Sequence, residues 1–148
     1  MQKGIDSYLR EQFDITDVDI RTYSPLTLAY IGDGIFDLII RSLVVAKGNA
    51  RAGQLHRRTS QIVKAKTQAE IIESIIPLLT EEEEFAYKLG RNHRISGKPK
   101  HASVSEYSRA TGLEAIFGYL HLTGNNERIQ TLIHAAYDDI FSDLKYKI

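Results

Sequence analysis

The sequence has 148 residues, with 19 basic and 19 acidic side chains and no cysteine. The length is that of one ordinary domain with a hydrophobic core, and the absence of cysteine excludes disulfides and thiolate metal sites and favours the reducing cytoplasm. Because no charge-free apolar stretch approaches the roughly 20 residues that span a bilayer, and the amino terminus lacks a signal-peptide core, we expect no membrane association.

Apolar side chains recur at helical spacing along the chain, and no alternating strand pattern appears. This periodicity predicts a short helix over 5–13. Ser24 followed by Pro25, an N-cap residue and a proline in the first turn, begins a long helix that reaches about residue 47. After a glycine-containing turn, the pattern predicts one continuous helix over 52–76 with a basic outer face.

Two capping boxes begin further helices in the second half of the chain: Thr80 with Glu83, and Ser103 with Glu106. A glycine is expected to end each of these helices. Asn125 caps a last amphipathic helix. We therefore expect an all-α fold of six or seven helices, in one domain that spans the whole chain.

The long central helix is apolar almost all round, and such a helix is normally buried. It nevertheless carries Asp33 and Asp37, and a buried carboxylate without a charged partner costs several kcal/mol. Arg41 is four residues after Asp37, at the spacing of an ion pair on one helix face. Asp33 has no such partner and lies between Gly32 and Gly34, so something should approach the backbone closely there.

Glu114 repeats this pattern in a second apolar helix, between Gly112 and Gly118. The two acids, Asp33 and Glu114, could meet across the core and face one cavity. Their oxygen atoms would suit Mg²⁺ or Mn²⁺, which activate water for displacement at phosphorus. The alternative is that each acid forms a structural pair with a distant arginine.

Charge is segregated along this neutral chain. Six basic residues and no acidic one lie within 47–69, six more basic residues lie within 85–109, and four consecutive acids occupy 81–84. This distribution is typical of a basic face with an acidic back, although solvated helix faces would give the same pattern. The polar, basic segment 91–102 is expected to be an exposed loop that contacts phosphates, or else simply a mobile loop.

Three blocks of the sequence resemble the ribonuclease III catalytic domain in order and separation. Residues 30–36 (YIGDGIF) are similar to the family's Gly-Asp signature, residues 53–63 to its next helix, and residues 112–118 (GLEAIFG) to its second acidic motif. The chain ends with no room for a double-stranded-RNA-binding domain. With the basic loop, this makes the sequence similar to the Mini-III subfamily in particular.

The resemblance implies an all-α endonuclease domain, active as a homodimer whose two sites line a valley for duplex RNA. It implies that Asp33 and Glu114 are catalytic and hold Mg²⁺, for which Mn²⁺ may substitute. Metal-activated water would hydrolyse a phosphodiester and leave 5′-phosphate and 3′-hydroxyl ends. The substrate class would be precursor ribosomal RNA, notably 23S, with a ribosomal protein as a conceivable helper.

Duplex RNA presents two rows of phosphate groups and few base edges that side chains can reach, so a protein that binds it needs spaced cations. Candidates come from the basic helix and the basic loop. They are Arg51, Arg57, Arg58, Lys64, Arg91, Asn92, Arg94, Lys98 and Lys100.

The sequence departs from the family pattern at three positions. Leu26 and Ala29 stand where the family usually has glutamates, and Thr111 stands where it has an aspartate. Thr111 could hold a metal-bound water, and Asp37 could replace a ligand unless it pairs with Arg41. The departures keep two alternatives open: an inert double-stranded-RNA-binding protein of the same fold, or a plain helical interaction domain.

Overall fold

The structure, a computed structural model, describes residues 5–16, 19–93 and 103–141. The all-α prediction is confirmed: within these residues the chain forms seven α-helices and two short 3₁₀ helices, without a strand. In chain order the elements are α1 (Ile5–Gln12), η1 (Ile20–Thr22), α2 (Pro25–Ala46), α3 (Ala52–Val63), α4 (Ala65–Ile75), η2 (Ile76–Leu78), α5 (Glu81–Arg91), α6 (Val104–Leu122) and α7 (Asn126–Phe141). None of the described helices is long and apolar enough to cross a membrane.

The predicted helix starts are confirmed by side-chain caps. The hydroxyl of Ser24 accepts a hydrogen bond from the backbone N–H of Thr27 at the start of α2. Both capping boxes form, at Thr80 for α5 and at Ser103 for α6. The backbone N–H of Arg128 donates to the side chain of Asn125 at the start of α7. These local bonds satisfy N–H groups that a helix start leaves without partners.

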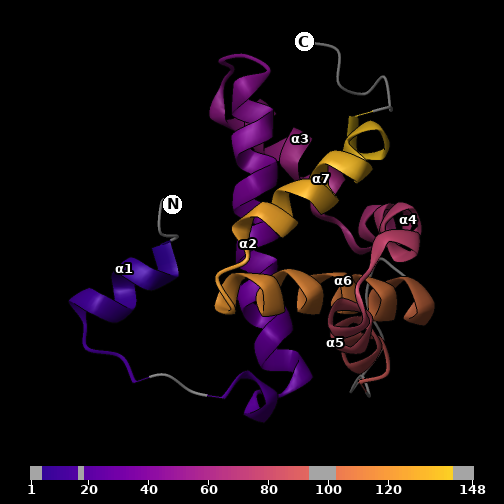
Figure 1. The fold of residues 1–148 in the computed structure, drawn as a ribbon. Coiled ribbons are helices and arrows are strands. Elements are labelled where there is room, and N and C mark those ends of the chain that lie inside the picture. Colours follow the sequence, from indigo (N-terminus) through magenta and orange to yellow (C-terminus); the bar gives the residue numbers. More distant parts are fainter. Residues whose placement is uncertain (1–4, 17–18, 94–102, 142–148) are drawn as a thin grey trace.

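Helices α2 and α6 cross in the centre of the molecule, and the other large helices pack around this crossing (Figure 1). Two glycines allow the close approach. A Cβ atom on Gly32 would overlap the carbonyl oxygen of Glu114, and a Cβ atom on Gly118 would overlap that of Leu28. Around the crossing, Phe36 of α2 stacks on Phe117 of α6 with ring centroids 5.7 Å apart, and both side chains are fully buried.

The prediction of one continuous helix over 52–76 is wrong, because the chain breaks into α3 and α4 at Lys64. Lys64 has an extended backbone, with ψ of 154°. Two side chains from α4 satisfy carbonyl groups that α3 leaves open at its end: Gln68 donates to Val63 at 2.7 Å, and Thr67 donates to Gln61 at 2.8 Å. These side-chain caps from the next helix compensate for the interrupted helical hydrogen bonds.

The expectation that α2 is buried on every face is also wrong. One face packs on α6, α3 and α5, whereas the opposite face presents four large apolar side chains to solvent. Their exposed fractions are 49% for Leu26, 76% for Tyr30, 60% for Leu38 and 59% for Val45. Helix α1 lies apart from the central bundle, on the side of α2 opposite α4 and α5 (Figure 1).

Candidate active site

The crossing of α2 and α6 places two acidic side chains together. Because Gly32 has no side chain, the backbone of Glu114 lies directly against α2. The next residue on α2 is Asp33, and its carboxylate is within hydrogen-bonding reach of the Glu114 carboxyl group. Residues far apart in the sequence thus form one pair of acids. Of the two, Asp33 is exposed and Glu114 is partly buried.

The environment of Glu114 disfavours its ionised form. Burial, which has the largest effect, together with the hydrogen bond with Asp33 and the negative charge of Asp33, raises the pKa of Glu114 to about 9. Two carboxylates in contact repel each other unless a proton or a cation lies between them. At neutral pH the pair therefore carries a proton on Glu114 or takes up a positive ion in its place.

The donor atoms of this pair fit a hard divalent cation. Carboxylate oxygens are the ligands that Mg²⁺ and Mn²⁺ prefer, and Mg²⁺ commonly uses one or two carboxylates and fills its remaining positions with water and substrate phosphate. In the part of the chain that the structure describes, no group of three or more histidine, cysteine or acidic side chains could hold a metal. An ion at Asp33 and Glu114 would thus keep open positions for water and phosphate.

The structure brings the two predicted metal ligands together, but it does not bury Asp33 as we expected from the apolar sequence of α2. The reason is that Asp33 lies at the edge of the exposed face of that helix, beside the crossing rather than under it. Neither acid has an ion pair with an arginine in the described segments. The catalytic and metal-binding roles of Asp33 and Glu114 remain predictions.

The two auxiliary candidates have other partners. Arg41 Nε donates to Asp37 Oδ2 at 2.6 Å, so the predicted ion pair on one face of α2 is present. Thr111 lies one turn before Glu114, and its hydroxyl donates to the carbonyl of Tyr107 at 2.9 Å. A hydroxyl that donates to its own helix keeps lone pairs as acceptors but presents no negative charge.

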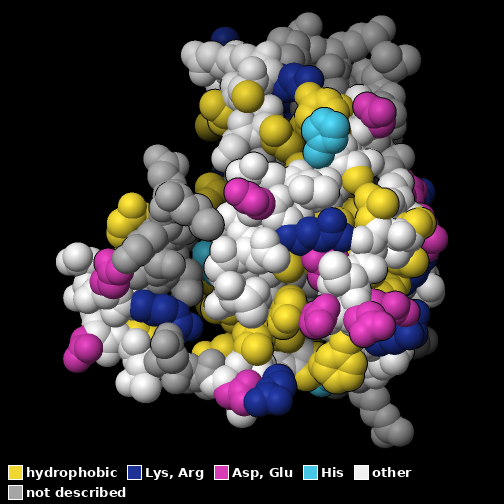
Figure 2. Space-filling model, viewed as in Figure 1, with side chains coloured by type: hydrophobic (Ala, Val, Ile, Leu, Met, Phe, Trp, Pro, Cys, Tyr) yellow, Lys and Arg dark blue, Asp and Glu magenta, His cyan; other side chains and the backbone are white. Residues whose placement is uncertain are grey.

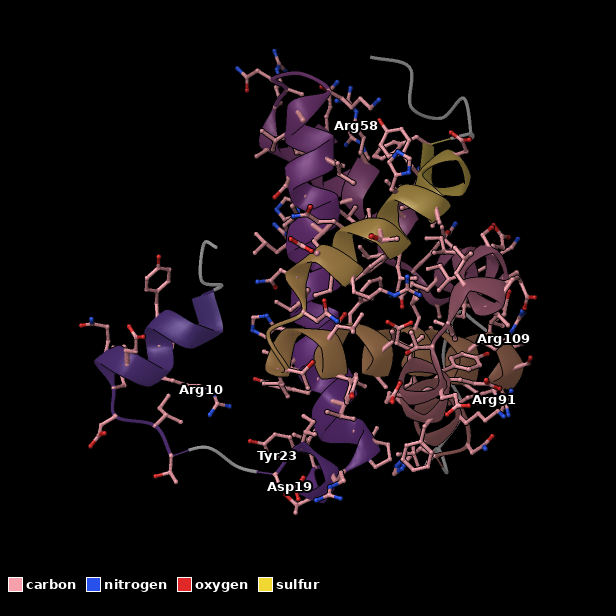
Figure 3. All side chains as sticks on the ribbon, in the orientation of Figure 1. Arg10, Asp19, Tyr23, Arg58, Arg91 and Arg109 are labelled. Atoms are coloured by element: carbon pink, nitrogen blue, oxygen red, sulfur yellow. The ribbon has the colours of Figure 1, made fainter. Side chains whose placement is uncertain are left out.

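The predicted RNA-binding residues on α3 have exposed side chains with one exception. Arg51, Arg57 and Lys64 are exposed, whereas Arg58 is partly buried and its Nη1 atom has no hydrogen-bond partner. Figure 3 shows Arg58 beside α3 at the end of the molecule remote from Arg91. The basic candidates therefore occupy two well-separated regions.

The second of these regions begins at the end of α5. The guanidinium of Arg91 lies 5.3 Å from the centre of the Tyr87 ring, and its Nε donates to the side chain of Asn92 at 3.2 Å. These contacts hold Arg91 in a defined orientation. The other loop candidates, Arg94, Lys98 and Lys100, lie outside the described residues.

Acidic side chains gather elsewhere on the surface. Figure 2 shows a cluster of them over the region of α5, whose first turn consists of Glu81, Glu82, Glu83 and Glu84. Only Glu83 of these four is buried. Burial raises its pKa, but hydrogen bonds from Arg128 and Thr80 outweigh this and lower the pKa of Glu83 overall. Arg128 Nε donates to Glu83 at 2.8 Å, which ties α7 to α5.

Sequence reasoning missed the exposed apolar face of α2, in particular Tyr30, which lies one turn before Asp33. A helix that is apolar all round can be buried either in its own domain or against another molecule, and the sequence pattern is the same in both cases. The departure at Thr111, by contrast, was readable from the sequence because the resemblance places an acid at that position.

Comparisons with known proteins show what this chain is similar to. The family model for the ribonuclease III domain matches residues 26–125. The chain is 41% identical over 119 residues to the Mini-ribonuclease 3 of Symbiobacterium thermophilum, covering 80% of this chain and 92% of the relative. It is 40% identical over 136 residues to the Mini-ribonuclease 3 of Thermoanaerobacter sp., covering 92% and 96%. A crystal structure of a Fusobacterium nucleatum protein superposes with a TM-score of 0.73 at 36% identity, covering 80% of this chain and 96% of that one.

Proposed function

Because the chain belongs to the ribonuclease III family, among the Mini-ribonuclease 3 proteins, and is therefore an endoribonuclease, we propose that it hydrolyses double-stranded RNA with Mg²⁺ held by Asp33 and Glu114. The observation that carries the proposal is the contact between these two carboxyl groups where α2 crosses α6. Mn²⁺, which has the same preference for oxygen ligands, can substitute.

A bound Mg²⁺ supplies a water of lowered pKa and a positive charge beside the phosphate that is cut. The residues of this chain hold the cation and orient the RNA strand. Asp33 is exposed, so it is open to an incoming RNA strand, while Glu114 lies deeper at the helix crossing. Glu114 must lose its proton when it binds the cation, because its pKa is raised to about 9. The products carry 5′-phosphate and 3′-hydroxyl ends.

The RNA is held through its phosphates. Exposed Arg51, Arg57 and Lys64 on α3 and the oriented Arg91 on α5 give spaced cations of the kind that an A-form duplex requires. Each such contact makes the affinity more dependent on salt. It releases counterions from the phosphates, and this release is less favourable when the salt concentration is higher. The acidic first turn of α5 lies at the opposite end of that helix from Arg91.

We propose precursor ribosomal RNA in the cytoplasm as the natural substrate, with maturation of 23S ends as the reaction. Support comes from the resemblance to Mini-III enzymes and from a cysteine-free composition that suits a reducing compartment. A ribosomal protein that shapes the RNA would be a reasonable helper.

The protein acts as a homodimer in this proposal. The apolar side chains of Leu26 and Tyr30 project from the exposed face of α2, next to Asp33, and Tyr30 is 76% exposed. An exposed apolar surface of this kind is typical of a contact with another molecule. Gly34 lies on the same open face, but Gly32 does not, because it is buried against α6. A two-fold contact through α2 would place two pairs of acids on one RNA duplex.

The test is cleavage of a long RNA duplex with Mg²⁺ by the parent protein and by Asp33→Asn, Glu114→Gln and Glu84→Gln. Glu84 is a matched control, since it is an exposed acid paired with Lys88 on α5. We expect the first two variants to lose cleavage while remaining folded, and the control to cut normally. If the parent binds the duplex in a gel-shift assay but never cuts it with either ion, the protein is the inert RNA-binding alternative.

A further inference from the structure

A small cleft of about 240 Å³ lies between α2 and α3, away from the two acids. Arg41 and Val45 line it from α2, and Leu55, His56 and Thr59 line it from α3. Val45 and Leu55 provide apolar walls and Thr59 lies buried at the bottom, whereas Arg41 and His56 are exposed at the rim. The cleft thus combines apolar walls with an arginine and a histidine from different helices.

Arg41 is held in one orientation by Asp37. Its Nε donates to Asp37 Oδ2 at 2.6 Å, and the structure gives its guanidinium no other hydrogen bond to a described residue. The two terminal nitrogens therefore still have N–H groups to donate, and the Arg41 side chain is 51% exposed. A guanidinium presents its N–H groups as a planar fork, which matches the oxygens of a phosphate.

The surroundings of the cleft favour an anion. Asp37 is neutralised by Arg41, and no acidic residue occurs between 47 and 69. Arg51 and Arg57 are exposed on α3, within one turn or so of His56 along the chain. Arg51 and Arg57 thus add positive charge to the helix that lines the cleft, although the whole chain carries no net charge.

We propose that this cleft binds a backbone phosphate of the RNA duplex, with the Arg41 fork and His56 as the contacting groups and Asp37 as the residue that positions Arg41. The inference rests on the proposed function, in which duplex RNA is the substrate. Arg41 follows Asp33 by two helical turns, about 12 Å along α2 at 1.5 Å per residue. The phosphate in the cleft is accordingly not the one that is cut, and the contact sets how the duplex lies across α2 and α3.

The test measures binding of a duplex RNA over a range of salt concentrations, with Asp33→Asn as the parent so that the RNA stays intact. Arg41→Gln and His56→Gln are compared with Arg21→Gln. Arg21 is a matched control, an exposed arginine that also pairs with an aspartate, Asp19, at 2.8 Å. We expect Arg41→Gln to reduce the salt slope of log K by about one, as for one lost phosphate contact, and Arg21→Gln to leave it unchanged.

A second readout reports on the cleft directly. In NMR spectra of the same parent, the ring signals of His56 should shift when the duplex is added and should shift less in the Arg41→Gln background. Unchanged His56 signals, or an unchanged slope for Arg41→Gln while the parent binds normally, would overturn the phosphate site and leave the RNA-binding proposal intact. A parent that binds no duplex would overturn both. Loss of dimer in sedimentation by Arg41→Gln would instead assign Arg41 to a protein contact and overturn the site.

Discussion

The carbonyl oxygen of Glu114 lies where a side chain on Gly32 would have to be. This overlap makes Gly32 the residue that sets the separation of α2 and α6, and with it the separation of the two acids. Gly34, only two residues later, has no atom within 4 Å of the position its Cβ would take. Close helix packing therefore requires glycine at position 32 but not at position 34.

We predict that Gly32→Ala lowers the free energy of unfolding by about 3 kcal/mol, because a helix backbone cannot move aside as a flexible side chain can. It should also abolish cleavage, since Asp33 and Glu114 are driven apart. Gly34→Ala is the control, and it should leave the fold unchanged or stabilise it by up to about 1 kcal/mol through better helix propensity. Urea unfolding of both variants checks this, and equal losses would contradict the assigned role of Gly32.

The raised pKa of Glu114 predicts a pH-dependent stability. The folded state holds the Glu114 proton to a pKa of about 9, against an ordinary value of 4.5, so folding is favoured while that proton is bound. The contribution is complete below about pH 4.5 and is lost as pH rises towards 9. Unfolding measured at pH 5, 7 and 9 without metal should show this decline, and Glu114→Gln should flatten it. A decline of the same size in Glu114→Gln would assign the effect to other groups.

Measuring the binding of Mn²⁺ shows whether Asp37 is a metal ligand or only the ion-pair partner of Arg41. Because Arg41 holds the Asp37 carboxylate at 2.6 Å, we predict that Asp37→Asn leaves Mn²⁺ affinity nearly unchanged. Asp33→Asn and Glu114→Gln should each weaken it by at least about tenfold, since each removes one of two carboxylate ligands. Calorimetric titration of the RNA-free protein measures these affinities. A large loss in Asp37→Asn would make Asp37 a third ligand.

The buried ion pair between Glu83 of α5 and Arg128 of α7 predicts a large stability effect. Glu83 is 1% exposed, and Arg128 also donates to the carbonyl of Leu78. Arg128→Met should cost about 3–5 kcal/mol because it leaves a buried carboxylate without its partner. Lys88→Met, which breaks the exposed pair with Glu84, should cost less than about 1 kcal/mol. Thermal unfolding of both variants provides the comparison, and similar losses would contradict it.

The sequence predicted the fold class and most helix starts because these depend on local signals, and it singled out the two acids that the structure brings together. Ser24, Thr80 and Ser103 cap helices through bonds within four residues, and glycines beside Asp33 and Glu114 indicated close backbone approach. The contact of Asp33 with Glu114 was one of two alternatives, the other being a pair of each acid with a distant arginine. Local sequence signals do not indicate which helices cross.

The remaining features depend on side-chain contacts between neighbouring helices, or on whether an apolar helix face is buried in its own domain or against another molecule. The break at Lys64 is stabilised by Gln68, whose side chain reaches back to α3, and no proline or glycine marks it. The exposed face of α2 carries large apolar side chains beside its charged ones, so hydrophobicity alone could not separate Tyr30 from Phe36.

The glycine crossing of α2 and α6 has a consequence for when the protein is able to cut. Asp33 and Glu114 belong to separate ends of the chain and meet only through that crossing. In an unfolded or nascent chain the two carboxylates are independent, and neither provides a paired site for an ion. Under the proposed function, the residues of α6 must leave the ribosome and dock on α2 before the metal site is complete, so an incomplete chain would not cut the RNA around it.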